Sequence, residues 1–235
     1  MNFTKFKYLQ QTKKFHDTKY KEKGIQFQRT YPNEDVIRFV NKYFSRKKGF
    51  FLDVGCGNGR HMNLLQSKGH KVDGLDFSSE ILRQIKKNKK FKNQQLIYDA
   101  LPLMQKVSDN TYDAVIDCFT SYAMLQDDFI LFLRNVKRIL KKNGIYHGQL
   151  ISFKSDLFKN YLPAKKIGKF SLKAIKRKNA PFYGDNYSFT FYKKEKILNI
   201  FKSLGFESVS LEIHSRTYRN TKEYFEYFVV VAKST

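Results

Sequence analysis

The stretch Leu52-Asp53-Val54-Gly55-Cys56-Gly57-Asn58-Gly59 decides the fold of this chain. It leads from an apolar strand through an acidic residue into glycines at every second position. Glycine has no Cβ, so its backbone can adopt positive φ values and let a ligand approach the loop closely. A dinucleotide site has the spacing Gly-x-Gly-x-x-Gly and presents its amides to a pyrophosphate, which differs from the spacing here. The carboxylate of Asp53 suits a ligand that carries an ammonium group.

Strand and helix patterns alternate along the chain on both sides of this loop. Strands are expected at residues 50–54, 71–75, 95–98, 112–118, 145–150, 205–214 and 224–232. Helices are expected at residues 34–44, 60–68, 127–141 and 193–204, with Asn143-Gly144 ending the third of these. A further helix is expected after a cap at Ser78 or Ser79, with Ile81, Leu82 and Ile85 facing inward. The alternation predicts a mostly parallel sheet with right-handed crossovers, which binds ligands at the carboxyl ends of its strands. The last helix and two strands favour an antiparallel pair at the sheet edge.

The length and composition favour one α/β domain with appendages. The chain has 235 residues, no run of eighteen apolar residues, and an N-terminus without an apolar segment. Its two cysteines, Cys56 and Cys118, are far apart and lack Cys-x-x-Cys spacing, so we expect neither a disulfide nor a zinc site. A protein of the reducing cytoplasm, with no membrane segment and no metal, is the expectation.

The formal net charge of +24 invites a nucleic-acid interpretation. The excess is uneven, because residues 151–183 hold nine Lys and Arg against one Asp, and residues 1–50 hold thirteen against four Asp and Glu. These two segments are expected to flank the substrate. An AT-rich genome, which favours lysine codons, explains the lysines equally well.

Three short motifs together resemble the class I S-adenosylmethionine-dependent methyltransferases. They are residues 52–61, Gly74-Leu75-Asp76-Phe77-Ser78, and Asp99-Ala100. The resemblance covers residues 33–150, and the C-terminal strand pair agrees with it. It implies an α/β Rossmann-like fold with a seven-stranded, mostly parallel sheet, helices on both faces and an antiparallel C-terminal strand.

The resemblance also implies S-adenosylmethionine as the cofactor. In this family the glycine loop backs the methionine part, the acid ending strand two accepts the ribose hydroxyls, and the acid ending strand three receives the adenine amino group. Asp76 supports the second role independently, since it lies about twenty residues beyond the loop, where ribose-binding acids are found. The expected cofactor-binding residues are Asp53, Gly55, Cys56, Gly57, Gly59, Asp76, Phe77, Asp99, Ala100, Asp117 and Tyr20.

In methyl transfer from a sulfonium the cofactor supplies the reactivity, and the protein mainly holds the nucleophile near the methyl carbon and removes its proton. The candidate catalytic residues are Asp117, Tyr122, His147 and His214. Cys118 lacks the preceding proline typical of pyrimidine C5 methyltransferases. The Asn/Asp-Pro-Pro-Tyr motif of enzymes that methylate adenine or glutamine amino groups is also absent.

Four regions are expected. Residues 1–32 form a partly ordered arm that can act as a lid through Tyr20 or Tyr31, and residues 33–150 form the cofactor-binding core. Residues 151–187 form a basic insertion for substrate recognition, in which lysines alternate with aromatic residues. Residues 188–235 complete the sheet.

Three functions remain open from the sequence. The first is methylation of an oxygen or nitrogen of a small, anionic metabolite, such as a phosphorylated or nucleotide-linked sugar. The second is methylation of RNA, with tRNA as the substrate class, and the third is a non-catalytic subunit that binds S-adenosylmethionine. The oligomeric state is not predicted.

Overall fold

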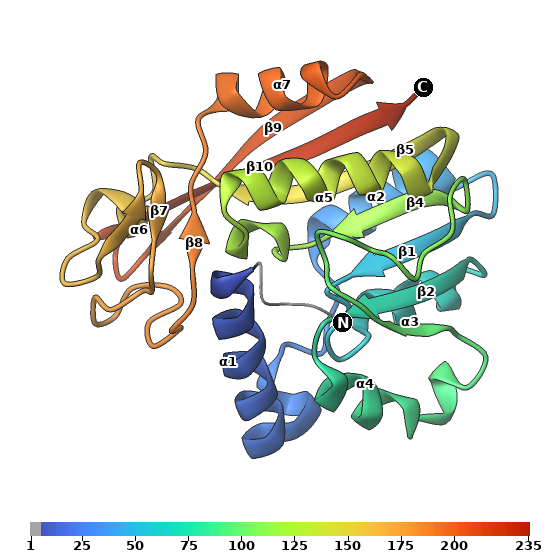
Figure 1. Ribbon diagram of the computed structural model, residues 1–235, viewed down its shortest axis with the longest axis horizontal. Helices are drawn as coiled ribbons and strands as arrows, with labels where there is room; N and C mark the ends of the chain where they lie inside the picture. The colour runs from blue at the N-terminus through green and yellow to red at the C-terminus, as the bar shows by residue number, and fades with distance from the viewer. Residues whose placement is uncertain (1–5) are drawn as a thin grey trace.

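The computed structural model describes residues 6–235 and contains a seven-stranded sheet in the order β3-β2-β1-β4-β5-β10-β9 (Figure 1). Strands β3, β2, β1, β4 and β5 are parallel, and β10 is antiparallel to both its neighbours. This confirms the expected Rossmann-like sheet and its C-terminal strand pair. The strands are β1 (Phe50–Val54), β2 (Lys71–Asp76), β3 (Leu96–Tyr98), β4 (Tyr112–Asp117), β5 (Leu140–Ile151), β9 (Phe206–Tyr218) and β10 (Glu223–Ser234).

Helices cover both faces of the sheet. One face packs against α5 (Gln126–Ile139) and α7 (Lys194–Ser203), which contribute Phe129, Val136 and Phe201 to the larger apolar core. The other face packs against α2 (Glu34–Phe44), α3 (Arg60–Ser67) and α4 (Ser79–Lys86). Side chains start two of these helices, since Asn33 accepts from Asp35 N–H and Ser78 accepts from Ile81 N–H.

The segment expected to be a partly ordered arm is a regular helix. Helix α1 (Lys7–Lys23) runs for 17 residues and continues into the 3₁₀ turn η2 (Gly24–Phe27). It stands between α4 and the 151–187 insertion (Figure 1). Only Leu9, Thr12 and Tyr20 of the helix are buried, so its sequence carries a weak apolar pattern and tertiary contacts stabilise it. Residues 1–5 of the expected arm lie outside the described residues.

The basic insertion folds as a small antiparallel sheet. It contains helix α6 (Asp156–Lys159) and strands β6 (Lys166–Gly168), β7 (Ser171–Leu172) and β8 (Phe189–Thr190), in the order β6-β7-β8. Strand β8 extends this unit beyond the expected boundary at residue 187. Strands of two or three residues are too short to show an alternation of apolar and polar residues, which is why the sequence did not predict them.

The junction of α5 and β5 differs from the prediction. The helix was expected to reach residue 141 and to stop at Asn143-Gly144, but Leu140 is already extended, with φ −71° and ψ 139°. Leu140 is buried and pairs with Tyr112 of β4, so its burial outweighs the helical pattern. Asn143 then adopts a φ of 64° inside the long strand.

A buried carboxylate closes the end of β4. Asp117 Oδ1 accepts from Thr120 N–H (3.2 Å) and Ser121 N–H (3.0 Å), and its Oδ2 accepts from the Tyr146 hydroxyl (2.7 Å). Burial raises the pKa of Asp117. These bonds fix the turn that leads from β4 to the 3₁₀ turn η4 (Ser121–Ala123).

Tyr146→Phe is expected to destabilise the protein by about 2 kcal/mol, because it leaves a buried carboxylate oxygen without its donor. Urea unfolding at neutral pH measures the change. Tyr218→Phe removes an exposed hydroxyl and is the matched control. Equal unfolding midpoints for the two variants would contradict a stabilising role for the bond between Tyr146 and Asp117.

Candidate functional site

The glycine loop at the carboxyl end of β1 has the backbone conformation that its sequence predicts. Gly55, Gly57 and Gly59 have φ values of 68°, 50° and 78°, a region that L side chains rarely adopt. A Cβ on Gly55 would lie 2.4 Å from Thr120 Oγ1, and one on Gly57 would lie 2.0 Å from Gln28 Oε1. Neither position tolerates a side chain without rearrangement.

Two acids flank this loop. Asp53 is buried, its Oδ1 lies 3.7 Å from His61 Nδ1, and its Oδ2 has no hydrogen-bond partner among the described residues. A buried carboxylate oxygen without a donor is costly. The orphaned oxygen therefore fits a cationic or hydrogen-bonding ligand beside the loop, which is what an amino-acid ammonium group would supply.

Asp76 ends β2 and ties the loop to that strand. Its Oδ2 accepts from Gly57 N–H (3.0 Å) and its Oδ1 accepts from Ser78 N–H (2.8 Å). Burial raises the pKa of Asp76 to about 6. A carboxylate offers about four lone-pair sites, so Asp76 keeps acceptor capacity for the two hydroxyls of a ribose.

The remaining expected cofactor residues lie along the same edge. Asp99, after β3, accepts from Ala100 N–H (2.7 Å) and Lys106 N–H (2.7 Å). Cys56, Phe77 and Ala100 are buried. The parallel strands thus bring three separate motifs to one edge, as the sequence predicted from their positions at strand ends.

Helix α1 and the turn after it cover this edge. Tyr20 is 1% exposed and packs in the same cluster as Cys56, and Asp76 is one of the charges that raise its pKa, second to burial. Gln28 Oε1 accepts from Asn58 N–H (3.1 Å), directly over the loop. The His16 ring meets the Phe77 ring edge-on at 5.9 Å. No sequence pattern marked Gln28 as part of the site.

The four candidate catalytic residues lie in different settings. Asp117 is occupied by the hydrogen bonds described above. His147 is fully buried in the middle of β5, stacks on Phe39 at 4.8 Å, and has no hydrogen bond among the described residues. Burial lowers the pKa of His147 to about 3, so its ring is neutral. His147 pairs with Ile116, one residue before the end of β4. A catalytic role for either residue stays a prediction without support from its surroundings.

His214 belongs to a buried polar network that the sequence did not reveal. Asp35 Oδ1 lies 3.3 Å from His214 Nδ1, and Asp35 Oδ2 accepts from Gln149 Nε2 (2.6 Å) and the Tyr227 hydroxyl (3.0 Å). Gln149 Oε1 in turn accepts from the Cys118 thiol (2.9 Å). Asp35 resembled an ordinary first-turn acid of α2, so no sequence signal marked it.

Tyr122 lies in η4, just beyond the end of β4, and joins that edge to the insertion. Its hydroxyl lies 2.7 Å from the Tyr187 hydroxyl, and Tyr187 donates to Asp185 Oδ2 (2.9 Å). The Tyr187 ring also contacts the rings of Phe15 (5.2 Å) and His16 (5.1 Å) on α1. A continuous aromatic wall therefore runs from the cofactor edge to the insertion.

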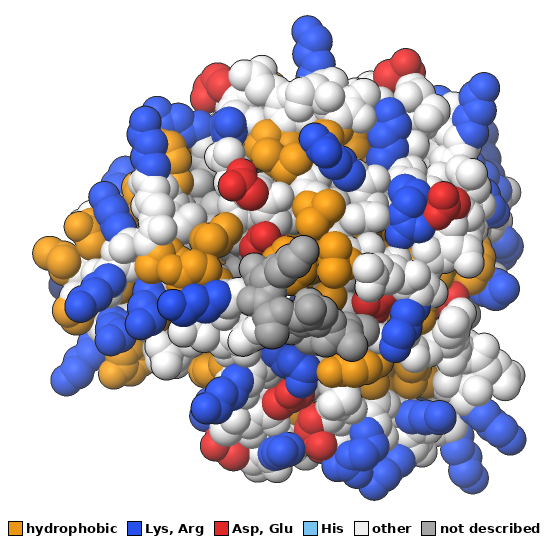
Figure 2. Space-filling view, in the orientation of Figure 1, with side chains coloured by type: hydrophobic (Ala, Val, Ile, Leu, Met, Phe, Trp, Pro, Cys, Tyr) orange, Lys and Arg blue, Asp and Glu red, His pale blue; other side chains and the backbone are white. Residues whose placement is uncertain are grey.

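A lysine-lined cavity of about 710 Å³ lies on the other side of this wall, between α1 and the insertion. Its cations are Lys14, Lys19, Lys165, Lys173 and Lys176, and Phe15, Ala174, Gly184 and Asn186 are also part of its lining. Of these lysines only Lys19 forms an ion pair within residues 6–235, with Glu22 at 2.8 Å. Figure 2 shows Lys and Arg side chains over the insertion, at the left of the view, with hydrophobic side chains between them.

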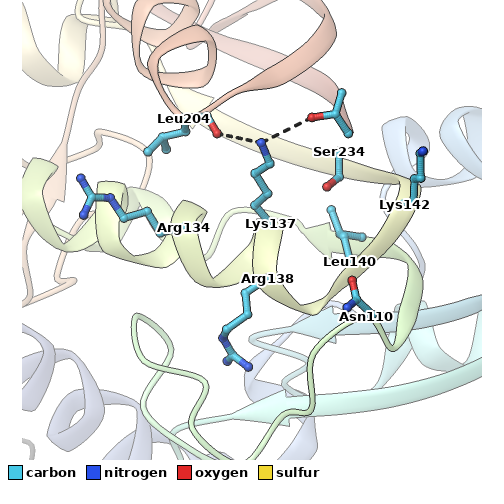
Figure 3. Close-up of a pocket in the computed structure, with 9 residues that line it drawn as sticks. Asn110, Arg134, Lys137, Arg138, Leu140, Lys142, Leu204 and Ser234 are labelled. Carbon is cyan, nitrogen blue, oxygen red and sulfur yellow. Dashed lines mark hydrogen bonds between the residues drawn. The ribbon is translucent and has the colours of Figure 1, made fainter.

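A second pocket, of about 430 Å³, lies at the opposite edge of the sheet, near Asn110, Leu140 and Ser234 (Figure 3). Two of its cationic side chains, Lys137 and Arg138, stabilise the fold through hydrogen bonds to main-chain carbonyls. Lys137 Nζ donates to the carbonyls of Leu204 (3.1 Å) and Gly205 (2.7 Å). Arg138 donates to main-chain carbonyls on the loop before β4. This pocket is therefore set apart from the strand ends where the expected cofactor residues meet.

Two further findings concern residues 6–235. No helix in this range is long and apolar enough to cross a membrane. No group of three or more His, Cys, Asp or Glu in the same range could hold a metal ion, and Cys56 and Cys118 are both free thiols.

Comparisons with known proteins agree with this geometry. Residues 51–144 match a family model described as a methyltransferase domain. The Bacillus subtilis protein YqeM is 34% identical over 103 residues, which are 42% of this chain and 41% of that protein. A ribosomal protein L11 methyltransferase from Dictyoglomus turgidum is 32% identical over 131 residues, which are 54% of this chain and 40% of the relative. The chain spans between 16% and 41% of the length of the curated relatives that it matches.

Solved structures share the fold over most of this chain. An S-adenosylmethionine-dependent methyltransferase from Methanosarcina mazei has a TM-score of 0.67 at 18% identity, and the match covers 83% of this chain and 96% of that one. Phosphoethanolamine N-methyltransferase 2 of Haemonchus contortus, in complex with S-adenosylmethionine, has a TM-score of 0.67 at 16% identity, covering 94% of this chain and 59% of that one. Residues 51–144 therefore match a methyltransferase domain, and the chain shares its fold with solved S-adenosylmethionine-dependent methyltransferases.

Asp76→Ala is expected to abolish the rise in melting temperature that S-adenosylhomocysteine produces in the wild-type protein, because the ribose hydroxyls lose their acceptor. A thermal scan with and without the ligand measures the shift. Asp109→Ala removes an exposed acid far from the site and should keep the full shift. An unchanged shift in Asp76→Ala would refute the ribose role.

The affinity for S-adenosylhomocysteine is expected to depend on pH. The pKa of Asp76 is about 6, and only the ionised carboxylate accepts two hydroxyl bonds. Protonation below that pH should therefore weaken binding by about tenfold per pH unit. Calorimetric titrations above and below pH 6 measure this. Asp185→Asn is the control, because Asp185 lies in the insertion and its pKa is also about 6. A dissociation constant independent of pH in the wild type would contradict the prediction.

Proposed function

We propose that this protein transfers a methyl group from S-adenosylmethionine to an oxygen or nitrogen of a small, anionic metabolite. Asp53, Asp76, Asp99 and the glycine loop are the residues proposed to hold the cofactor, which supplies the methyl group as a sulfonium. Tyr20 and the rest of α1 act as the lid over it. The acceptor lies between the end of β4 and the insertion.

The single observation that carries the choice of acceptor is the lysine-lined cavity. Four of its five lysines have no ion pair among the described residues, and the lining contains no acid. Clustered cations without counter-charges attract anions and strengthen their binding. Phe15 lines this cavity and contacts the Tyr187 ring (5.2 Å), and the Tyr187 hydroxyl lies 2.7 Å from the Tyr122 hydroxyl near the end of β4, so the cavity adjoins the proposed acceptor site.

The enclosure favours a small acceptor over RNA. Tyr122 and Tyr187 are 5% and 2% exposed, and α1 closes over the neighbouring edge. RNA methylation would require a base to enter this enclosed space from an unpaired strand. Phosphoethanolamine N-methyltransferase 2, which shares the fold, is named for a phosphorylated small acceptor, and this supports the choice of such an acceptor here.

Incubation with labelled S-adenosylmethionine and a size-fractionated cell extract tests the proposal. Label is expected in the small-molecule fraction. Replacing Lys173 and Lys176 by Gln should raise the KM for that fraction by about tenfold, since two cations near an anion contribute roughly 1 kcal/mol or less each. Lys86→Gln with Lys87→Gln, at the exposed C-terminal end of α4, is the matched control.

Label in the RNA fraction, together with tRNA binding that weakens steeply with salt, would overturn the metabolite acceptor in favour of RNA. Cofactor binding with no label in any fraction would overturn the enzymatic proposal in favour of a binding subunit. In either case the thermal-shift test of Asp76 still reports on the cofactor site by itself.

A further inference from the structure

A chain of three polar groups connects the end of β4 to the insertion through an otherwise apolar cluster. Tyr122, Tyr187 and Asp185 form it, with 2.7 Å between the two hydroxyl oxygens and 2.9 Å from Tyr187 to Asp185 Oδ2. Phe182, Phe189 and other apolar side chains surround the two tyrosines. Buried polar groups in such surroundings are costly unless they are paired, so the chain calls for an explanation.

The chemistry of the three groups determines which of them donates each hydrogen bond. An ionised carboxylate only accepts hydrogen bonds, so Tyr187 donates to Asp185. The Tyr187 oxygen then accepts from Tyr122. Tyr122 has no other hydrogen bond within residues 6–235, so its oxygen keeps an unused lone pair. A hydrogen-bond donor outside these three residues can bind to that lone pair. The O–H or N–H group of the molecule that receives the methyl group is such a donor.

The two ends of this hydrogen-bonded chain, Tyr122 and Asp185, lie in different parts of the structure. Tyr122 lies in η4, four residues after Cys118 and just beyond the end of β4. Asp185 lies between Gly184 and Asn186, which both line the lysine cavity. The chain therefore crosses the aromatic wall, from the edge where methyl transfer is proposed to the cavity that opens to solvent.

We propose that Tyr122, Tyr187 and Asp185 carry the proton that the acceptor loses during methyl transfer. This inference rests on the proposed function. As the acceptor atom bonds to the methyl carbon, the carbon–sulfur bond breaks and its electron pair stays on sulfur. The acceptor proton moves to the Tyr122 oxygen, the Tyr122 proton to Tyr187, and the Tyr187 proton to Asp185 Oδ2. Asp185 ends neutral and releases the proton to solvent through the cavity.

The surroundings of Asp185 suit a terminal proton acceptor. The groups that face it are Tyr187 from its own segment, Tyr122 through Tyr187, and Lys19 from α1, and Lys173 and Lys176 line the adjoining cavity. Burial raises the pKa of Asp185 to about 6, against the opposing effects of Tyr187 and Lys19. At neutral pH the carboxylate is ionised and can take a proton, and it holds that proton better than an exposed Asp would.

Asp185→Asn, Tyr187→Phe and the matched control Tyr183→Phe test the proposal. Tyr183 is a neighbouring, 55% exposed tyrosine. With the small-molecule fraction of a cell extract and labelled cofactor that saturates the enzyme at every pH, so that the titration of Asp76 does not contribute, wild-type methyl transfer should rise with pH through about 6, as Asp185 loses its proton. Asp185→Asn and Tyr187→Phe should lose this rise and fall by roughly a hundredfold at neutral pH, the size of a general-base contribution. Tyr183→Phe should match the wild type.

A second readout needs no turnover. In protein labelled with carbon-13 aspartate, the Asp185 carboxyl signal should titrate near pH 6, and Tyr187→Phe should shift that midpoint because it removes a direct hydrogen bond. The wild-type affinity for S-adenosylhomocysteine should persist in all three variants, which shows that they fold.

Normal transfer with the wild-type pH profile in Asp185→Asn would overturn the proton path while leaving the proposed function intact. If the wild type labels no small molecule, the proposed function fails, and the path from an acceptor fails with it. An Asp185 midpoint near the ordinary value for Asp, unaffected by Tyr187→Phe, would overturn the path whichever acceptor is found.

Discussion

The hydrogen bond from Gly57 N–H to Asp76 is the contact on which the rest of the site depends. It joins the loop after β1 to the end of β2 across adjacent parallel strands, and it forms only because Gly57 can take a φ of 50°. Once it is in place, Asp53 on one side and Asp99 on the other lie along one edge. The cost is a buried carboxylate whose charge is poorly solvated, a state that a bound polar ligand relieves.

The central fold could be predicted from the sequence because local and global signals agree there. The strand from Phe50 to Val54 and the helix after Gly59 follow from apolar periodicity and glycine placement, and both match the structure within one residue at each end. The acids Asp76 and Asp99 could be placed because a parallel sheet puts all strand ends on one edge. No knowledge of side-chain contacts was needed.

The features that the sequence did not predict depend on tertiary contacts. Helix α1 has too few buried positions to show a period, and β6 to β8 are too short to alternate. Asp35 and Gln149 are 114 positions apart in the chain and meet only because α2 packs against β5. Contacts between residues so far apart in the chain cannot be recognised from the local sequence. For the same reason the sequence suggested Asp117 as a base, although its carboxylate already accepts hydrogen bonds from Tyr146 and from two backbone N–H groups.

The position of β10 has a consequence for biogenesis. This strand lies between β5 and β9, so residues 223–234 supply the inner partner of strands made earlier. Until they leave the ribosome, β5 presents an unpaired backbone edge, which is a template for intermolecular pairing. The nascent polypeptide therefore stays vulnerable to aggregation until residues 223–234 have been made, and chaperones can engage the open β5 edge during that interval.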